Sequence, residues 1–437
     1  MIRALITVAV VLMTALPALA AVKIQEITSP GGIRAWLVEE HSLPFTALEL
    51  RFEGGASLDA PGKRGATTLM TSTLEEGAGD LDSQGFAAAR EALAADISFD
   101  VGDDAVSVSA QMLTENRDQV VALLKSALTE PRFDQDAIDR VRAQIDSLIR
   151  QDETDPGRIS SRTLDRLAFG DHPYGTVRNG TLDSLAALTR DDLIAAKDAV
   201  LARDRVSVAA VGDITPEALG KLIDEVLGPL PAKGAPMPPH VTPDLTGGVT
   251  VVDFDSPQSV VNFGQPGITR DDPDFFAAYV LNHIIGGQGF SARLMDEVRE
   301  KRGLTYGIGT FLMPLNLAET WQGTFSSANE KVAEAIGVVQ DVWADVAANG
   351  VTEAELDAAK TYLTGSFPLR FDGNDRIAGI LVGMMAEGLP ASYVNDRNGY
   401  IEAVTLDDVK RVAQRLMTPG GLRFVVVGKP VGLQTTN

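Results

Sequence analysis

Alternating hydrophobic and polar residues indicate strands in the first part of each half of the chain. Residues 45–54 alternate, so one face of a strand carries Leu48, Leu50 and Phe52. Residues 97–113 predict a β-hairpin that turns at 102–104, where the sequence is Gly-Asp-Asp. Strands that are grouped apart from later helices predict an α+β fold.

Helical periodicity follows these strands. We expect helices in the first half at residues 63–77, 84–94, 115–129, 135–152, 158–169 and 190–202. Thr215 before Pro216 marks another helix start, because threonine caps a helix and proline suits its first position. Thr352 and Glu355 form a capping-box pattern that opens one more helix.

The two halves of the chain resemble each other. In the first, a Thr189-Arg-Asp-Asp-Leu helix start precedes the apolar strand 206–212; in the second, a Thr405-Leu-Asp-Asp-Val start precedes the strand 422–428. A proline- and glycine-rich segment separates them, which is typical of an extended linker. We therefore predict two homologous α+β domains, each with a mixed, mainly antiparallel sheet packed with helices. The predicted bounds are 1–20 for a signal peptide, 21–230 for the N-terminal domain, 231–248 for the linker and 249–437 for the C-terminal domain.

The N-terminal segment resembles an export signal. Arg3 precedes an apolar run at residues 4–16, and Ala18-Leu19-Ala20 supplies a cleavage pattern, so we expect cleavage after Ala20. The alternative is an uncleaved membrane anchor, for which the run is short. We expect a periplasmic or secreted protein.

The chain is acidic, with a formal net charge of -22. Such a surface repels nucleic acid and anionic lipid and would attract basic peptides, although the charge also has a simpler interpretation as a solubility feature. There is no cysteine, which excludes disulfides, thiol chemistry and zinc sites with cysteine ligands.

Residues 284–306, which read IIGGQGFSARLMDEVREKRGLTY, carry the most specific pattern of the chain. This segment resembles the C-terminal-half signature of the zinc-peptidase family of pitrilysin, insulinase and mitochondrial processing peptidase. Residues 257–259 and 266–274 resemble the segments that precede it in that family. The resemblance implies two similar α+β domains that form half of a clamshell around a peptide chamber.

The family places its zinc site on a His-x-x-Glu-His helix of the N-terminal half. Aligned on the flanking glycines, this sequence has Thr68 and Ser72 at the two histidine positions and Thr71 at the glutamate position. The distal glutamate would fall near Ser147 or Leu148, where there is none. Hydroxyls cannot replace imidazoles and a carboxylate as zinc ligands, so we expect no metal and no cofactor in this chain.

The histidines offer no substitute site. They are His41, His172, His240 and His283, and none lies three to five residues from another. We interpret His172 as a loop-ordering residue and His283 as a residue of an apolar helix face. Zinc is expected instead in a homologous partner subunit.

In the family, an arginine and a tyrosine of the C-terminal half reach toward the catalytic centre. They match Arg302 and Tyr306, which would donate hydrogen bonds to the substrate carbonyl oxygen in trans. The structural alternative is that Arg302 caps a helix C-terminus beside Gly303 and that Tyr306 packs at a strand start. Within this signature we favour the functional interpretation.

The glycine-rich turn of the signature is a candidate substrate-binding segment, with Gly287, Gly289, Phe290 and Ser291. Close backbone packing is the alternative for these glycines. We predict the non-catalytic subunit of a heterodimeric zinc peptidase that handles peptides or unfolded proteins and is inactive by itself. The alternatives are a stand-alone peptide-binding protein and a purely structural subunit.

Overall fold

The first half of the chain builds one β-sheet. The computed structural model describes residues 23–287 and 291–436, so the predicted signal peptide and the cleavage after Ala20 lie outside the described residues. Within the described part this sheet has six strands in the order β1-β2-β8-β3-β7-β6. Their bounds are β1 Gln25–Thr28, β2 Arg34–Glu39, β3 Phe45–Glu53, β6 Asp96–Val101, β7 Ala105–Leu113 and β8 Val206–Gly212. A small ribbon adds β4 Gly77–Ala78 and β5 Leu81–Asp82.

The second half builds another sheet of the same design. Among the described residues it has five strands in the order β11-β12-β10-β13-β9. Their bounds are β9 Gly248–Asp253, β10 Gln258–Pro266, β11 Ile308–Pro314, β12 Glu319–Ala328 and β13 Arg423–Gly428. Each sheet has one parallel pair, β2 with β8 and β9 with β13, and its other pairs are antiparallel. The repeated pairing agrees with the internal duplication, and the predicted α+β fold is confirmed.

Helices cover the sheets in both halves. Those of the first half are α1 Ala66–Ser72, α2 Ser83–Ala92, α3 Arg117–Thr129, α4 Gln135–Asp152, α5 Pro156–Phe169, α6 Leu182–Ala186, α7 Arg190–Val200 and α8 Pro216–Leu227. Those of the second half are α9 Phe275–Gly286, α10 Val332–Asn349, α11 Glu353–Ser366, α12 Asn374–Ala386, α13 Tyr393–Ala403 and α14 Leu406–Leu416. The predicted caps are present, because Thr189, Thr352 and Thr405 each close a capping box and Thr215 accepts from the Ala218 amide.

The predicted helix at 63–77 is shorter than expected, since α1 ends at Ser72. It begins where the Asp59 carboxylate accepts hydrogen bonds from the Gly65 and Thr67 amides, which caps the helix from outside. At its other end the Thr73 hydroxyl donates to the carbonyls of Leu69 and Met70. Side-chain bonds of this kind compete with the helical ladder, and the chain turns away after them.

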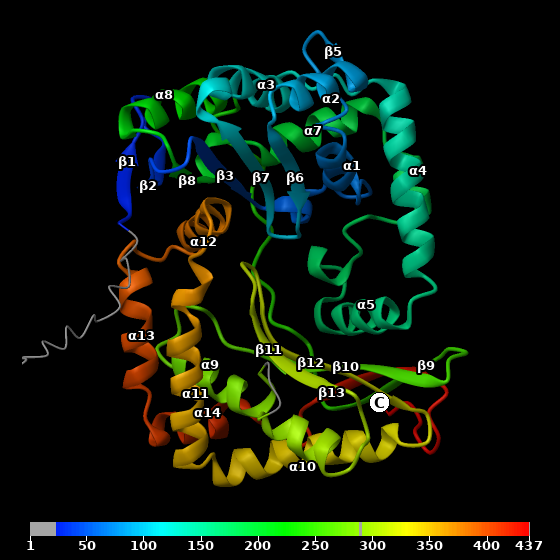
Figure 1. The fold of residues 1–437 in the computed structure, drawn as a ribbon. Coiled ribbons are helices and arrows are strands. Elements are labelled where there is room, and N and C mark those ends of the chain that lie inside the picture. Colours follow the sequence, from blue (N-terminus) through cyan, green and yellow to red (C-terminus); the bar gives the residue numbers. More distant parts are fainter. Residues whose placement is uncertain (1–22, 288–290, 437) are drawn as a thin grey trace, which may run out of the picture.

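One helix from each half packs on the sheet of the other half. The helix α12 packs on β3 and β8 of the first sheet, where Leu381 and Val382 meet Trp36 and Val211. In Figure 1 this orange helix lies beneath the blue strands of the N-terminal half, while the teal α5 lies against β10 and β13 of the C-terminal half. The two helices occupy equivalent places in the duplication, since each is the third α-helix after the hairpin of its own half, β6–β7 or β11–β12.

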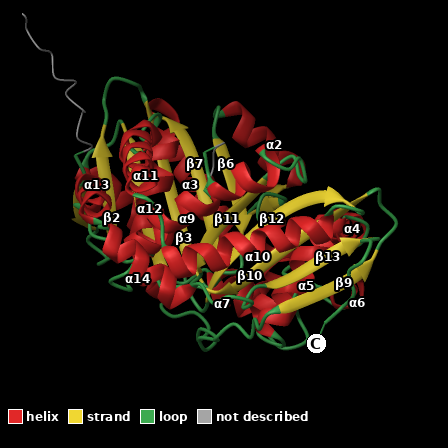
Figure 2. Ribbon diagram, turned by 90° about the horizontal axis from the view of Figure 1, so that it is seen from below, coloured by secondary structure: helices red, strands yellow, loops and turns green. Residues whose placement is uncertain are grey.

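The exchanged helices fill the sheet faces that their own half leaves uncovered. On α5, a buried apolar cluster joins Leu164 and Phe169 to Val425 and Val427 of β13. The helix α10 covers the opposite face of that sheet, as Figures 1 and 2 show together. In the first sheet the alternation predicted for β3 is confirmed, because Leu48, Leu50 and Phe52 belong to the main core and Ala47 faces α12.

The segment between the sheets lies along both halves. Residues 231–247 form neither helix nor strand. The Val241 amide donates to the Leu317 carbonyl at 2.8 Å, and the Asp244 amide donates to the Ala168 carbonyl at 2.8 Å.

Among the helices at residues 23–287 and 291–436, none is both long and apolar enough to cross a membrane.

Candidate functional site

The positions aligned with the family's zinc site lie on α1, where the Thr68 and Thr71 side chains are buried and Ser72 is half-buried. The Thr68 hydroxyl donates to the Arg178 carbonyl at 3.0 Å, so this side chain is already hydrogen-bonded to the backbone. Thr71 is 1% exposed, and within the described residues its hydroxyl has no hydrogen-bond partner. Ser147, near the expected distal ligand, donates to the carbonyl of Ala143 in its own helix. These groups do not fit a zinc ion, which needs imidazole, thiolate or carboxylate ligands.

The histidines are also dispersed in the fold. His41 lies between two carboxylates, but Asp213 contacts its Nδ1 at 2.8 Å and Glu39 contacts its Nε2 at 3.3 Å, on opposite sides of the ring. These contacts raise the pKa of His41, with its hydrogen bond to Asp213 as the largest cause. In the described ranges no group of three or more His, Cys, Asp or Glu side chains is placed to hold a metal.

His172 and His283 have the local surroundings that were expected. His172 Nε2 lies 3.1 Å from the Pro239 carbonyl and its Nδ1 accepts from the Tyr174 amide, so it orders the loop after α5. His283 stacks on Tyr362 with ring centroids 4.9 Å apart, and burial lowers its pKa. Neither contributes to a common site.

Arg302 follows a π-helical turn at Met295–Glu300. Its Nη1 donates to the backbone carbonyl of Glu297 at 2.7 Å and to the Glu297 carboxylate at 2.5 Å. Hydrogen bonds from Lys301, and then from Arg302, hold the pKa of Glu297 below its usual range. The chain then turns at Gly303, whose φ of 59° lies in the left-handed region. Arg302 therefore makes the helix-end contact that was the structural alternative for it.

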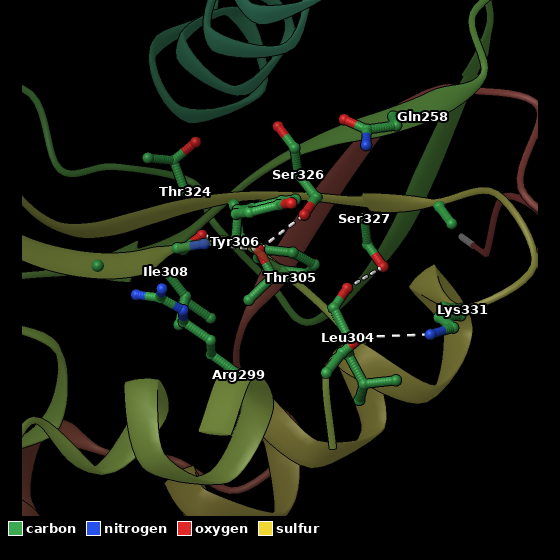
Figure 3. Close-up of a pocket in the computed structure, with 15 residues that line it drawn as sticks. Gln258, Arg299, Leu304, Thr305, Tyr306, Ile308, Thr324, Ser326, Ser327 and Lys331 are labelled. Atoms are coloured by element: carbon green, nitrogen blue, oxygen red, sulfur yellow. Dashed lines mark hydrogen bonds between the residues drawn. The ribbon is translucent and has the colours of Figure 1, made fainter. Parts of the chain in front are cut away.

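Tyr306 differs from its structural alternative, because its side chain does not pack at the start of β11. It is 89% exposed and lines the rim of a cavity of about 760 Å³. Figure 3 shows its ring between Ser326 and Thr305. The Thr305 hydroxyl donates to the Ser326 carbonyl at 2.7 Å and the Ser327 hydroxyl donates to the Leu304 carbonyl at 2.5 Å. These bonds fix the loop that presents Tyr306.

The remaining walls of this cavity come from the π-helical turn, from β10, β11 and β12, and from the residue before α10. Arg299 and Lys331 supply its two cationic side chains, and Lys331 Nζ donates to the Gly303 carbonyl at 3.2 Å (Figure 3). No sequence motif marks Lys331, since it lies between β12 and α10, outside the signature segment. Its position in the sequence could have indicated this placement. Lys331 comes just before an apolar helix, and that helix must pack against the strands that line the cavity.

The glycine-rich turn is only partly described. Gly286 packs closely on β11, because a Cβ atom there would lie 2.4 Å from the Thr310 hydroxyl and 2.8 Å from its amide nitrogen. Gly287 lines a smaller cavity beside β11 and leaves no room for a side chain next to His283. Ser291 is exposed. Gly289 and Phe290 lie outside the described residues, so the substrate-binding assignment of this turn stays a prediction.

A second cavity, of about 360 Å³, lies between the two halves and was not predicted. Its walls carry Asp100, Asp103, Asp104 and Asp165, with Arg51 as the only lining cation among the described residues. Burial, and then the charge of Asp103, raise the pKa of Asp165 to about 7.

Tyr174 ties this second cavity to both halves. Burial, and then its hydrogen bond to Asp104, raise the pKa of Tyr174. The same phenol accepts a hydrogen bond from the Leu317 amide at 3.1 Å. This region therefore joins the β6–β7 turn to the β11–β12 connection.

The comparisons with known proteins agree with one another. The model of the peptidase M16 inactive domain family matches residues 187–363. The non-peptidase homolog YmxG of Helicobacter pylori is 26% identical over 390 residues, which cover 89% of this chain and 90% of that protein. An uncharacterized zinc protease of Streptomyces coelicolor is 26% identical over 409 residues, covering 90% and 87% of the two chains. The crystal structure of a peptidase M16 inactive domain from Pseudomonas fluorescens is similar with a TM-score of 0.88 and 29% identity, covering 95% of this chain and 100% of that one.

Proposed function

Because this chain belongs to the M16 peptidase family of pitrilysin, insulinase and mitochondrial processing peptidase, and lacks the His-x-x-Glu-His motif, we propose that it is the non-catalytic subunit of a heterodimeric zinc peptidase. The partner would be a homologue that carries the zinc motif. This chain would supply Arg302, Tyr306 and part of the chamber wall.

The two side chains suit the stabilisation of a growing negative charge. When water attacks a peptide carbonyl, charge develops on the carbonyl oxygen, and donors already aimed at that oxygen lower the barrier. The Arg302 guanidinium has five N–H donors, and its hydrogen bonds to Glu297 use only Nη1. The Tyr306 phenol adds one neutral donor. Zinc held by the partner would supply the activated water.

The exposure of Tyr306 is the observation that carries the proposal. A tyrosine that served only the fold of this chain would bury much of its ring, yet this ring is 89% exposed at the rim of a cavity of about 760 Å³. Its loop is nevertheless fixed by hydrogen bonds to β12. An ordered loop that holds a tyrosine ring in solvent supports contact with another molecule, because tyrosine is enriched at protein interfaces.

The proposal also includes the location and the substrate of this assembly. The apolar segment at residues 4–16 and the Ala-x-Ala pattern before residue 21 support export to the periplasm. The substrate would be a peptide or an unfolded protein segment, since the donors address a backbone carbonyl that every peptide carries. No nucleic acid and, after signal cleavage, no membrane would be involved.

Reconstitution tests the proposal. The purified mature chain alone should hold no stoichiometric zinc by elemental analysis and should not cleave peptides. With its zinc-bearing homologue, peptide hydrolysis should appear, and Arg302→Ala or Tyr306→Phe should lower turnover at least about tenfold, as loss of a transition-state donor does. Tyr362→Phe is the matched control, because Tyr362 is also exposed but lies on α11 against His283.

Complex formation must be measured beside turnover, by size-exclusion chromatography of each mixture. Full activity of both Arg302→Ala and Tyr306→Phe complexes would remove the role in trans. An assembled complex without any hydrolysis would favour the non-proteolytic alternatives, a peptide-binding protein or a structural subunit.

A further inference from the structure

The cavity beside Tyr306 is free of carboxylates although the chain as a whole is acidic. The sequence has 60 acidic and 38 basic residues. Yet this cavity is lined by Arg299, Lys331, several hydroxyls and one amide, with no Asp or Glu among its described lining residues. The cavity between the halves has the opposite character, with four aspartates and one arginine. The acidic residues are thus unevenly distributed around the two cavities.

Lys331 is the cation that is placed to receive an anion. Its Nζ donates to the Gly303 carbonyl at 3.2 Å, and it forms no ion pair with a carboxylate of the described residues. An ammonium group has three donors, so two remain for a ligand. The neighbouring Glu330 does not line the cavity. In the signature segment, Glu297 is already paired with Lys301 and Arg302, and Glu300 is paired with Arg299.

The hydroxyl groups add neutral donors to this charge. Tyr306 and Ser326 line the cavity, and Gln258 stands at its upper edge in Figure 3. Thr324 also lines it, but its hydroxyl already donates to the Val261 carbonyl. A volume of about 760 Å³ lies within the range of ligand-binding pockets. An ammonium group with hydroxyl and amide donors around it is the environment that binds a carboxylate.

We propose that this cavity binds a carboxylate-bearing segment of a peptide. The peptide nature of the ligand rests on the proposed function, whereas the preference for a carboxylate rests on the lining residues alone. The net charge of the chain predicts the reverse preference, for basic peptides. At physiological ionic strength, however, charges more than about 10 Å away are largely screened. The groups in the cavity wall therefore determine which peptides bind there.

Binding to the isolated mature chain tests this proposal. Fluorescently labelled short peptides that carry glutamates are compared by anisotropy with the same peptides carrying glutamine, each with a free or an amidated C-terminus. We expect the glutamate peptides, the free C-termini or both to bind about tenfold tighter than their neutral counterparts, with affinity that falls as salt is added. The peptide pairs identify whether side chains or the C-terminus supply the carboxylate.

Two charge reversals locate the site. Lys331→Glu should remove the preference for carboxylates. Lys360→Glu is the matched control, because Lys360 also donates to a backbone carbonyl, that of Glu402, and does not line this cavity. Both variants change the net charge equally, and circular dichroism confirms that each is folded.

The proposal is overturned if acidic, neutral and basic peptides bind alike or not at all. It is also overturned if Lys331→Glu binds the acidic peptides as well as Lys360→Glu does. These measurements need neither zinc nor the partner, so their failure leaves the reconstitution experiment intact. In the same way, a failed reconstitution would leave the carboxylate preference measurable.

Discussion

Arg302 and Glu297 lie five residues apart and are bound to each other twice, once through the Glu297 carbonyl and once through its carboxylate. Residues five apart do not face each other on an α-helix, but a π-helical turn brings them together. The Lys301 amide donates to the Asp296 carbonyl at 2.9 Å, which is the hydrogen bond that such a turn forms. The turn therefore fixes one end of the guanidinium and leaves its other donors available.

Glu297→Gln should lower the turnover of the reconstituted peptidase by about tenfold, because a mobile Arg302 is no longer aimed at the substrate carbonyl. The stability of the chain should change by only ~1 kcal/mol or less, since this ion pair is partly exposed. Measuring kcat and KM separately shows whether the loss lies in turnover. Glu300→Gln is the control, as Glu300 pairs with Arg299 instead; equal turnover in the two variants would contradict a positioning role for Glu297.

The pKa of Asp165 predicts how stability depends on pH. Burial raises its folded-state pKa to about 7, whereas its ordinary value is 3.8. The folded state therefore keeps a proton that the unfolded state loses, so this group's contribution to the free energy of unfolding falls as pH rises between these two values. Asp165→Asn should stabilise the chain by roughly 1–2 kcal/mol in urea unfolding near pH 8 and by much less near pH 4. An equal effect at both pH values would show that the Asp165 proton is not involved.

Ser160 joins the two halves and its removal should be costly. Its buried hydroxyl donates to the Val425 carbonyl at 3.1 Å and accepts from the Asn262 amide at 3.0 Å. Ser160→Ala leaves both backbone groups without that partner, and we expect a loss of about 1–3 kcal/mol in the free energy of unfolding. Thr163→Ala on the same helix is the comparison, because the Thr163 hydroxyl bonds only within α5. A similar loss in both variants would mean that the helix, and not the bond between halves, is affected.

Gly286 should not tolerate a side chain. A Cβ atom would lie 2.8 Å from the backbone nitrogen of Thr310, which cannot move without disturbing β11. Gly286→Ala should therefore lower the free energy of unfolding by about 1–3 kcal/mol. Gly337→Ala in α10, where a Cβ atom meets nothing within 4 Å, should instead stabilise by about 0.5–1 kcal/mol. Thermal unfolding of the two variants should shift in opposite directions, and a shift of the same sign in both would refute the packing argument.

The elements that the sequence predicts well are those specified by local patterns. The hairpin at 97–113 turns at Gly102, and the caps at Thr189 and Thr405 lie where their spacing predicts them. The exchange of α5 and α12 was not predicted, because periodicity shows that a helix has an apolar face but not which sheet that face will meet.

In the candidate site, too, local sequence patterns could be predicted and contacts that depend on the fold could not. The resemblance to the family located Arg302 and Tyr306, whereas the partner of Arg302 depends on a π-helical turn that an α-helical pattern does not reveal. The charge of the cavity beside Tyr306 depends on Lys331, which only the fold brings to the signature loop. The total charge of the sequence averages over such local differences and therefore does not reveal the two cations that line this cavity.

The reciprocal packing of α5 and α12 also limits how the molecule can move. Each sheet is completed by a helix whose chain continues into the other half, so the two halves cannot separate without exposing Leu164 and Leu381 to water. A hinge motion within one polypeptide would expose these apolar side chains to water each time the two halves separated. In the proposed assembly of two such chains, admission and release of a peptide would therefore come from displacement of one chain relative to the other.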